Sequence, residues 1–262
     1  MTEGSPAGVP GPVLFARYAF PPNSHGFCGP PDSGGFFEYG VAGRDDGGLR
    51  AMARQFAGAW PYLELIAGAT GLSDPLDRRV VEAYWIGSPR LDRVGTRPVG
   101  DSMEDRFRHL TGARFPSITV GVLAGGVPHH SFAVLCIYPY TGLLTDGRKA
   151  PHALTVLDRC RIRWGRVRAV LGDEVVVESR PLTWDGLALF LGPPRTETAV
   201  RSVDGVGLAG PLRPGDWVSL HWEWVCDRLT EAQVGRLHRY TARHLAIVND
   251  RETRSAVPAL LG

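Results

Sequence analysis

Cys160 is the residue of this sequence with the clearest chemical use, and it lies in the segment 158–167 (DRCRIRWGRV). A cysteine thiolate binds soft metal ions and takes part in redox reactions. The alternative interpretation is a small buried hydrophobic residue. Because the residues after Cys160 have the pattern of a small β-barrel, the sequence places a thiol at the start of a barrel and favours metal or redox chemistry there.

A second thiol, Cys28, lies in a loop dense in glycine and proline over residues 23–32. Such a segment is neither a helix nor a central strand, and loops often carry functional side chains. Cys28 is a candidate catalytic nucleophile, for which His25 in the same loop is a candidate base. It is also a candidate second thiolate ligand beside Cys160. The remaining interpretation is a tight connector in which Cys28 is buried packing.

His129 and His130 are adjacent and precede a predicted strand, so their side chains are expected on opposite faces. One of the two can therefore face a site that contains Cys28. Under this hypothesis His129 is a base for Cys28, and His130 is a metal ligand. Cys136 and Cys226 lie in apolar segments and are predicted to belong to the core.

Composition and motifs argue against several classes of function. The 29 basic and 27 acidic residues give a net charge of +2, and the basic residues are scattered, so no nucleic-acid partner is expected. The absence of CxxC, Walker, GxGxxG and HExxH motifs argues against zinc ribbons, thioredoxin-type sites and nucleotide-driven chemistry. No apolar run is long enough to span a membrane. Residues 1–12 lack the pattern of a secretory signal, so we expect a cytoplasmic protein with free thiols.

Residues 13–150 are predicted to form a mostly helical domain with a small sheet. A short apolar run that begins at residue 13 is expected to stop at Pro21 and Pro22. The spacing of apolar residues predicts helices over 36–41, 49–60, 62–70 and 75–85. The two strands of the small sheet are predicted over 118–123 and 131–138. We expect a linker over 141–153.

Residues 154–249 are predicted to form an OB-like β-barrel that ends in a helix. Short strands alternate with turns, as at Gly172 and Asp173. The predicted strands cover 155–164, 165–171, 174–180, 187–191, 197–203 and 217–225. A helix is expected from Thr230 to about residue 248, because Thr230 and Gln233 fit a capping box. The predicted fold class is therefore α+β, in two domains.

Residues 159–248 resemble the HypC/HupF family of hydrogenase maturation chaperones. The resemblance rests on three segments in the same order and at similar intervals: 160–167 (CRIRWGRV), 172–177 (GDEVVV), and 214–221 (PGDWVSLH) followed by 229–233 (LTEAQ). The first segment is similar to the cysteine and strand that open the family's barrel. The second is similar to its first turn and returning strand. The third is similar to its strand that ends in histidine, followed by its closing helix.

This resemblance implies a binding and transfer protein rather than a turnover enzyme. It would bind or hand over the Fe(CN)2CO unit of a nickel-iron hydrogenase and dock to the hydrogenase large subunit or another maturation protein. Cys160 takes the place of the iron ligand, and His221 takes the place of the histidine beside it. A soft thiolate suits low-spin Fe(II). Cys28, with His129 or His130, would supply a second ligand or partner contacts.

The N-terminal part resembles an uncharacterised actinobacterial family in which segments like 18–23, 28–30, 81–87 and 129–132 recur. The resemblance implies genes near those of nickel-iron hydrogenases, which agrees with the resemblance of the barrel. Two alternatives stay open. One is a cysteine-dependent enzyme that uses Cys28 with a nearby histidine. The other is an interaction module without metal chemistry, which predicts a buried Cys160 with no polar neighbour.

Overall fold

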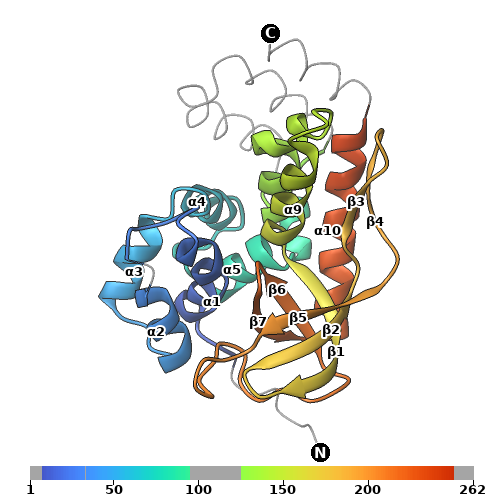
Figure 1. The fold of residues 1–262 in the computed structure, drawn as a ribbon. Coiled ribbons are helices and arrows are strands. Elements are labelled where there is room, and N and C mark those ends of the chain that lie inside the picture. Colours follow the sequence, from blue (N-terminus) through green and yellow to red (C-terminus); the bar gives the residue numbers. More distant parts are fainter. Residues whose placement is uncertain (1–7, 33, 95–124, 251–262) are drawn as a thin grey trace, which may run out of the picture.

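The structure is a computed structural model that describes residues 8–32, 34–94 and 125–250 (Figure 1). Its N-terminal helices are α1 (Gly11–Ser24), α2 (Gly34–Ala42), α3 (Gly47–Arg54), α4 (Trp60–Ala69), α5 (Arg78–Trp85) and the short η1 (Pro89–Arg93). The next are α8 (His130–Phe132), η3 (Ala133–Ile137), η4 (Pro139–Leu143) and α9 (Ala150–Cys160). The strands are β1 (Arg163–Leu171), β2 (Glu174–Ser179), β3 (Leu182–Trp184), β4 (Leu189–Leu191), β5 (Arg195–Val200), β6 (Trp217–His221) and β7 (Trp224–Leu229), followed by α10 (Glu231–Asn249).

The predicted N-terminal helices are present with shifted ends. The helix expected over 49–60 is divided, because α3 ends at Arg54 and α4 begins at Trp60. The helix expected from residue 75 begins at Arg78, because Asp77 is the residue whose carboxylate caps it, through the backbone N–H of Arg79.

The expected stop at Pro21 and Pro22 is wrong, since α1 continues through both prolines to Ser24. A proline inside a helix lacks the N–H that would bond to the carbonyl four residues earlier. For Pro22 that carbonyl belongs to Tyr18, and it accepts a hydrogen bond from His221 instead. A partner from the barrel thus replaces a bond that the helix cannot make.

The strand predicted over 131–138 is also wrong, because these residues form α8 and the π-helical η3. His129 caps this segment by accepting the backbone N–H of Ser131. The run is buried on nearly all sides, and a short apolar run of this kind has no periodicity that separates a strand from a buried helix. The other predicted strand, 118–123, lies outside the described residues.

The OB-like barrel and the α+β class are confirmed. Five strands close in the order β1-β2-β5-β7-β6, and β1 pairs with both β2 and β6. All neighbours are antiparallel except β5 and β7, which pair in parallel at Val200 and Trp224. The turn at Gly172 joins β1 to β2, and the capping box of Thr230 and Gln233 begins α10 as predicted.

Two other predicted strands are wrong in their bounds. Residues 155–160 belong to helix α9, and β1 begins only at Arg163. The start of α9 also falls inside the expected linker over 141–153. The strand predicted over 217–225 is a hairpin, in which β6 and β7 meet at a tight turn after His221. Trp222 in this turn has a left-handed backbone with φ of 53°, which is uncommon for a bulky residue.

A shared hydrophobic cluster joins the predicted domains 13–150 and 154–249, beside two smaller clusters among the described residues. A single buried cluster contains Phe15 and Trp85 from the N-terminal helices, Ile162 before the barrel, and Leu237 from α10. In Figure 1 the helices α1–α5 lie on one side of the barrel, and α9 and α10 rise from it on another. No helix within the described ranges is both long and apolar enough to span a membrane.

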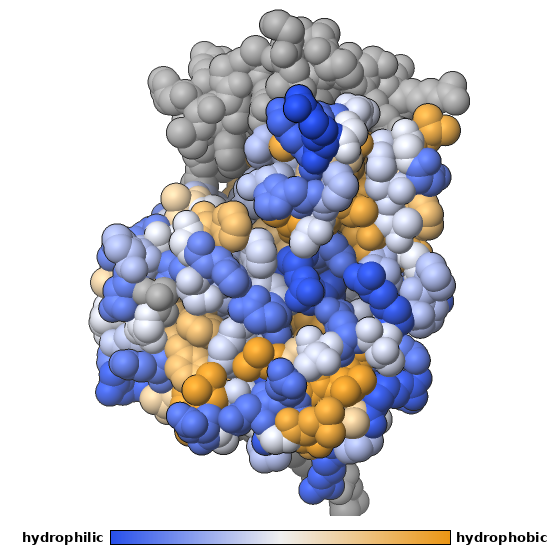
Figure 2. Space-filling view, viewed as in Figure 1, coloured by the Kyte–Doolittle hydropathy of each residue, from blue (hydrophilic) through white to orange (hydrophobic). Residues whose placement is uncertain are grey.

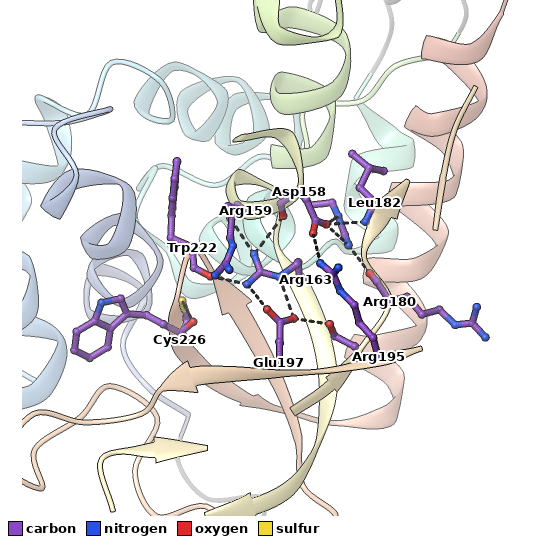
Figure 3. Close-up of polar contacts among 12 residues, drawn as sticks. Asp158, Arg159, Arg163, Arg180, Leu182, Arg195, Glu197, Trp222 and Cys226 are labelled. Atoms are coloured by element: carbon purple, nitrogen blue, oxygen red, sulfur yellow. Dashed lines mark hydrogen bonds and ion pairs between the residues drawn. The ribbon is translucent and has the colours of Figure 1, made fainter. Parts of the chain in front are cut away.

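A buried ionic network joins the end of α9 to the barrel (Figure 3). The guanidinium of Arg163 is 1% exposed and pairs with Glu197 of β5 at 3.1 Å. The same group donates to the backbone carbonyls of Asp158 and Arg159 in α9 and to the carbonyl of Trp222 in the β6–β7 turn. Arg161, equally buried, pairs with Asp158 at 2.8 Å.

Arg163→Met is expected to destabilise the protein by about 3–5 kcal/mol, because it leaves the buried Glu197 carboxylate without its cationic partner and removes a charged donor from three carbonyls. Arg168→Met is the matched control, because Arg168 pairs with Glu178 at the surface, and about 1 kcal/mol or less is expected. Urea denaturation of both variants measures the two free energies of unfolding. Equal losses in the two variants would contradict the role given to Arg163.

Candidate metal centre

Three side chains that could hold a metal meet between the helices and the barrel: His130, Cys160 and His221. One ligand atom from each lies within 4.8 Å of the others, and all three residues are buried. β1 and β6 are paired with Arg163 opposite Leu220, so the residues just before β1 and just after Leu220 are neighbours. This register brings Cys160 and His221 together, and α8 adds His130.

His221 is held in the orientation that a metal ligand needs. Its Nδ1–H donates to the Tyr18 carbonyl at 2.7 Å, which places the lone pair on Nε2. Nε2 is fully buried and has no hydrogen-bond partner among the described residues. Burial, together with the neighbouring His130, lowers the pKa of His221 well below its usual value. The imidazole is therefore neutral, with a free lone pair inside the protein.

His130 is also neutral and fixed by two contacts. Its Nε2–H donates to the Cys160 carbonyl at 2.8 Å, and its Nδ1 lies 3.2 Å from the Tyr84 hydroxyl. Burial lowers the pKa of His130 to about 4, although the bond to the Cys160 carbonyl acts in the opposite direction. The ring lies next to that of His221, with 5.2 Å between their centroids.

Cys160 is the last residue of α9, and its thiol is buried. Burial raises the pKa of this thiol, and a negative charge on Cys28 raises it further. The thiol is therefore protonated at neutral pH until a cation displaces the proton. The interaction module without metal chemistry predicts a Cys160 with no polar neighbour, whereas two imidazoles lie beside it.

Cys28 lies beside this cluster but is not one of the three residues that converge. Asn23 holds its loop, because the side-chain amide donates to the carbonyls of Cys28 and Pro30, both at 2.7 Å. Burial raises the pKa of the half-buried Cys28 thiol, and a hydrogen bond with Tyr138 partly offsets this. A raised pKa disfavours the thiolate that a nucleophile needs.

Neither candidate base contacts Cys28 through any hydrogen bond found in the described chain. His25 is exposed and pairs with Glu223 at 2.9 Å, while its ring packs on Trp222. Phe27, next to Cys28, also stacks on Trp222, with 4.7 Å between ring centroids. The loop that follows α1 therefore rests on the β6–β7 turn, which directly follows His221.

His129 faces a different buried cluster from His130, as expected of adjacent residues, although a helix start rather than a strand separates them. Its Nδ1 accepts hydrogen bonds from the backbone N–H and the hydroxyl of Ser131. The Ser131 oxygen accepts in turn from Nδ1–H of His244 at 2.7 Å. Burial lowers the pKa of His129 to about 3 and that of His244 well below its usual value.

Sequence reasoning missed several residues that line the centre. Tyr84 and Trp85 belong to the helix predicted over 75–85 and were counted only among its apolar residues. The centroid of the Trp85 ring lies 4.6 Å from that of His130 and 5.7 Å from that of His221. The signal that could have found them is the segment 81–87, which carries two large aromatic residues with polar atoms next to each other. Cys136 and Cys226 belong to the core, as predicted, Cys136 at its edge.

The buried histidines predict a fold that is sensitive to acid. The pKa values of His129, His130, His221 and His244 are lowered in the folded protein, so below about pH 6.5 the unfolded chain binds protons that the folded chain does not. Stability therefore falls as the pH falls, by about 1.4 kcal/mol per pH unit for each histidine. Urea denaturation at about pH 7.5 and about pH 5.5 measures this slope.

His152→Gln provides the control for this slope, because it removes an exposed histidine that is not one of the four buried imidazoles. A free energy of unfolding that does not change over this pH interval would contradict the neutral, buried state of the four imidazoles.

The model of a family of unknown function, DUF6390, matches residues 7–255, which is nearly the whole chain. No curated protein and no solved structure matches the chain.

Proposed function

We propose that this chain, which belongs to the DUF6390 family, binds and hands over a metal unit through Cys160, His221 and His130. The observation that supports this most is the buried Nε2 of His221, which lacks a partner among the described residues and belongs to a set of potential ligands that includes a thiol. A buried polar atom without a partner costs free energy, and a metal ion would satisfy it.

The donor set suits a soft or borderline ion. Thiolate and imidazole ligands favour iron, zinc, copper or nickel over magnesium and calcium. A tetrahedral ion bound at about 2.0–2.3 Å holds its donors roughly 3.5 Å apart, so binding would draw the three ligand atoms, now within 4.8 Å, slightly inward. Three protein ligands leave coordination positions for groups that the metal brings with it.

The metal unit that we propose is Fe(CN)2CO, as cargo for a nickel-iron hydrogenase. Support comes from the resemblance to the hydrogenase maturation chaperones, which rests on a barrel with a closing helix and on Cys160 and His221, two residues that lie together here. On this proposal the chain works in the cytoplasm as a maturation or accessory protein. Its partner is the hydrogenase large subunit or another maturation protein.

Cys28 is proposed as the thiol at which the metal unit enters or leaves. It is half-buried, whereas Cys160 is buried, and it is near enough for its charge to raise the pKa of Cys160. Cys28 makes a hydrogen bond with Tyr138, and the Tyr84 hydroxyl lies 3.2 Å from Nδ1 of His130. Two thiols in sequence would let the unit pass by ligand exchange without release into water.

Co²⁺ binding followed by visible spectroscopy tests the metal centre. The wild-type protein should show a thiolate-to-cobalt charge-transfer band that is absent in Cys160→Ser, and His221→Gln should weaken Co²⁺ binding by about 10-fold or more. Cys136→Ser is the control, because Cys136 is a second thiol, outside the three-residue cluster, that contacts the His244 carbonyl. A charge-transfer band that survives in Cys160→Ser would contradict the proposed ligand.

Infrared spectroscopy of the protein purified from its native host tests the cargo. Cyanide and carbonyl stretching bands are expected in the wild-type protein, and they should be lost in Cys160→Ala. Cys136→Ala, with the same chemical change outside the cluster, should keep them. If the wild-type protein shows neither these bands nor iron by elemental analysis, it is not a carrier of Fe(CN)2CO. The Co²⁺ experiment would still decide whether the metal centre exists.

A further inference from the structure

Two tryptophans beside the metal centre carry buried indole N–H groups without a hydrogen-bond partner in the described ranges. They are Trp85 at the end of α5 and Trp222 in the β6–β7 turn. Indole nitrogen donates a hydrogen bond and cannot accept one, and it usually finds a partner when it is buried. Both groups therefore lack an acceptor within the described part of the chain, where Nε2 of His221 also has no hydrogen-bond partner.

Contacts place both rings next to the donor set. Trp85 is fully buried, and its ring lies 4.6 Å from the ring of His130 and 5.7 Å from that of His221. Trp222 directly follows His221, donates its backbone N–H to the Arg159 carbonyl, and packs on the buried cluster that contains Cys160. Trp85 thus lies against the two imidazoles, and Trp222 packs on the hydrophobic cluster of which Cys160 is a member.

A bare cation cannot satisfy these groups together. It would accept the lone pair of His221, but the positive edge of an indole N–H is repelled by a cation and needs an electron-rich atom. A metal that carries its own acceptor ligands meets both needs, because the metal binds the imidazole and thiolate while its ligands accept the N–H groups.

We propose that Trp85 and Trp222 are specificity-determining residues that donate hydrogen bonds to anionic or other acceptor ligands carried by the metal. This inference rests on the proposed metal-binding function and adds the residues that would recognise the ligands carried by the metal. Trp85 acts from the side of His130 and His221, and Trp222 from the side of Cys160. The guanidinium of Arg163 donates a hydrogen bond to the Trp222 carbonyl and so fixes the backbone of Trp222.

The test uses Co²⁺ as the metal and azide as the acceptor ligand, with the full chain and its Trp85→Phe variant. The wild-type protein loaded with Co²⁺ should bind azide, seen as a change in its visible spectrum. Trp85→Phe keeps an aromatic ring and removes the N–H. It should retain Co²⁺ affinity and raise the azide dissociation constant by about tenfold or more, the effect of one hydrogen bond to a charged group.

Trp60→Phe is the matched control, because its indole N–H already donates to Glu64 at 2.7 Å, and it should leave the azide dissociation constant unchanged. Trp222→Phe gives a second, independent arm and carries the test if Trp85→Phe loses Co²⁺ itself. The proposal is overturned if Co²⁺-loaded wild-type protein does not take up azide, or if a variant that retains Co²⁺ binds azide as the wild type does. A wild-type protein that fails to bind Co²⁺ through Cys160 would instead overturn the proposed function, and this inference with it.

Discussion

The buried guanidinium of Arg163 is the interaction on which the arrangement of the metal centre depends. It holds the last carbonyls of α9, the carboxylate of Glu197 and the turn between β6 and β7 in one place. Cys160 is the last residue of that helix, and His221 ends the strand that precedes the turn. Because a guanidinium donates in fixed directions, these backbone segments cannot shift independently, and the sulfur and the imidazole keep their relative position.

The centre also depends on the union of the helical part with the barrel. His130 and Trp85 come from the helical part, Cys160 from the junction, and His221 from the barrel, so the site exists only where the two parts share their core. Most of the surface in the view of Figure 2 is hydrophilic, with hydrophobic patches gathered in its lower half. The three potential ligands are all buried, and the loop around Phe27 rests on Trp222.

The sequence allowed the barrel to be predicted where local chemistry decides the structure, as at the Gly172 turn and the Thr230 cap. It failed over 131–138, because a short buried apolar run has no polar face to reveal its period. It also failed over 155–160, the end of helix α9, whose first residues lie in the segment that was expected to be a linker. The pair Cys160 and His221 came from a family resemblance. Trp85 was missed, because its place in the apolar stripe of a helix predicts only a core residue, whereas its ring also lies beside His130 and His221.

The Tyr18 carbonyl shows how a residue without a functional group can control a site. Pro22 has no N–H to return to that carbonyl, and the vacant acceptor sets the tautomer of an imidazole about two hundred residues later in the chain. The side chain at position 18 takes no part in this bond, whereas the ring at position 22 removes the helical N–H that would otherwise share the carbonyl. In evolutionary terms, a related sequence that keeps this centre is expected to have a proline in its first helix, together with the cysteine and the histidines themselves.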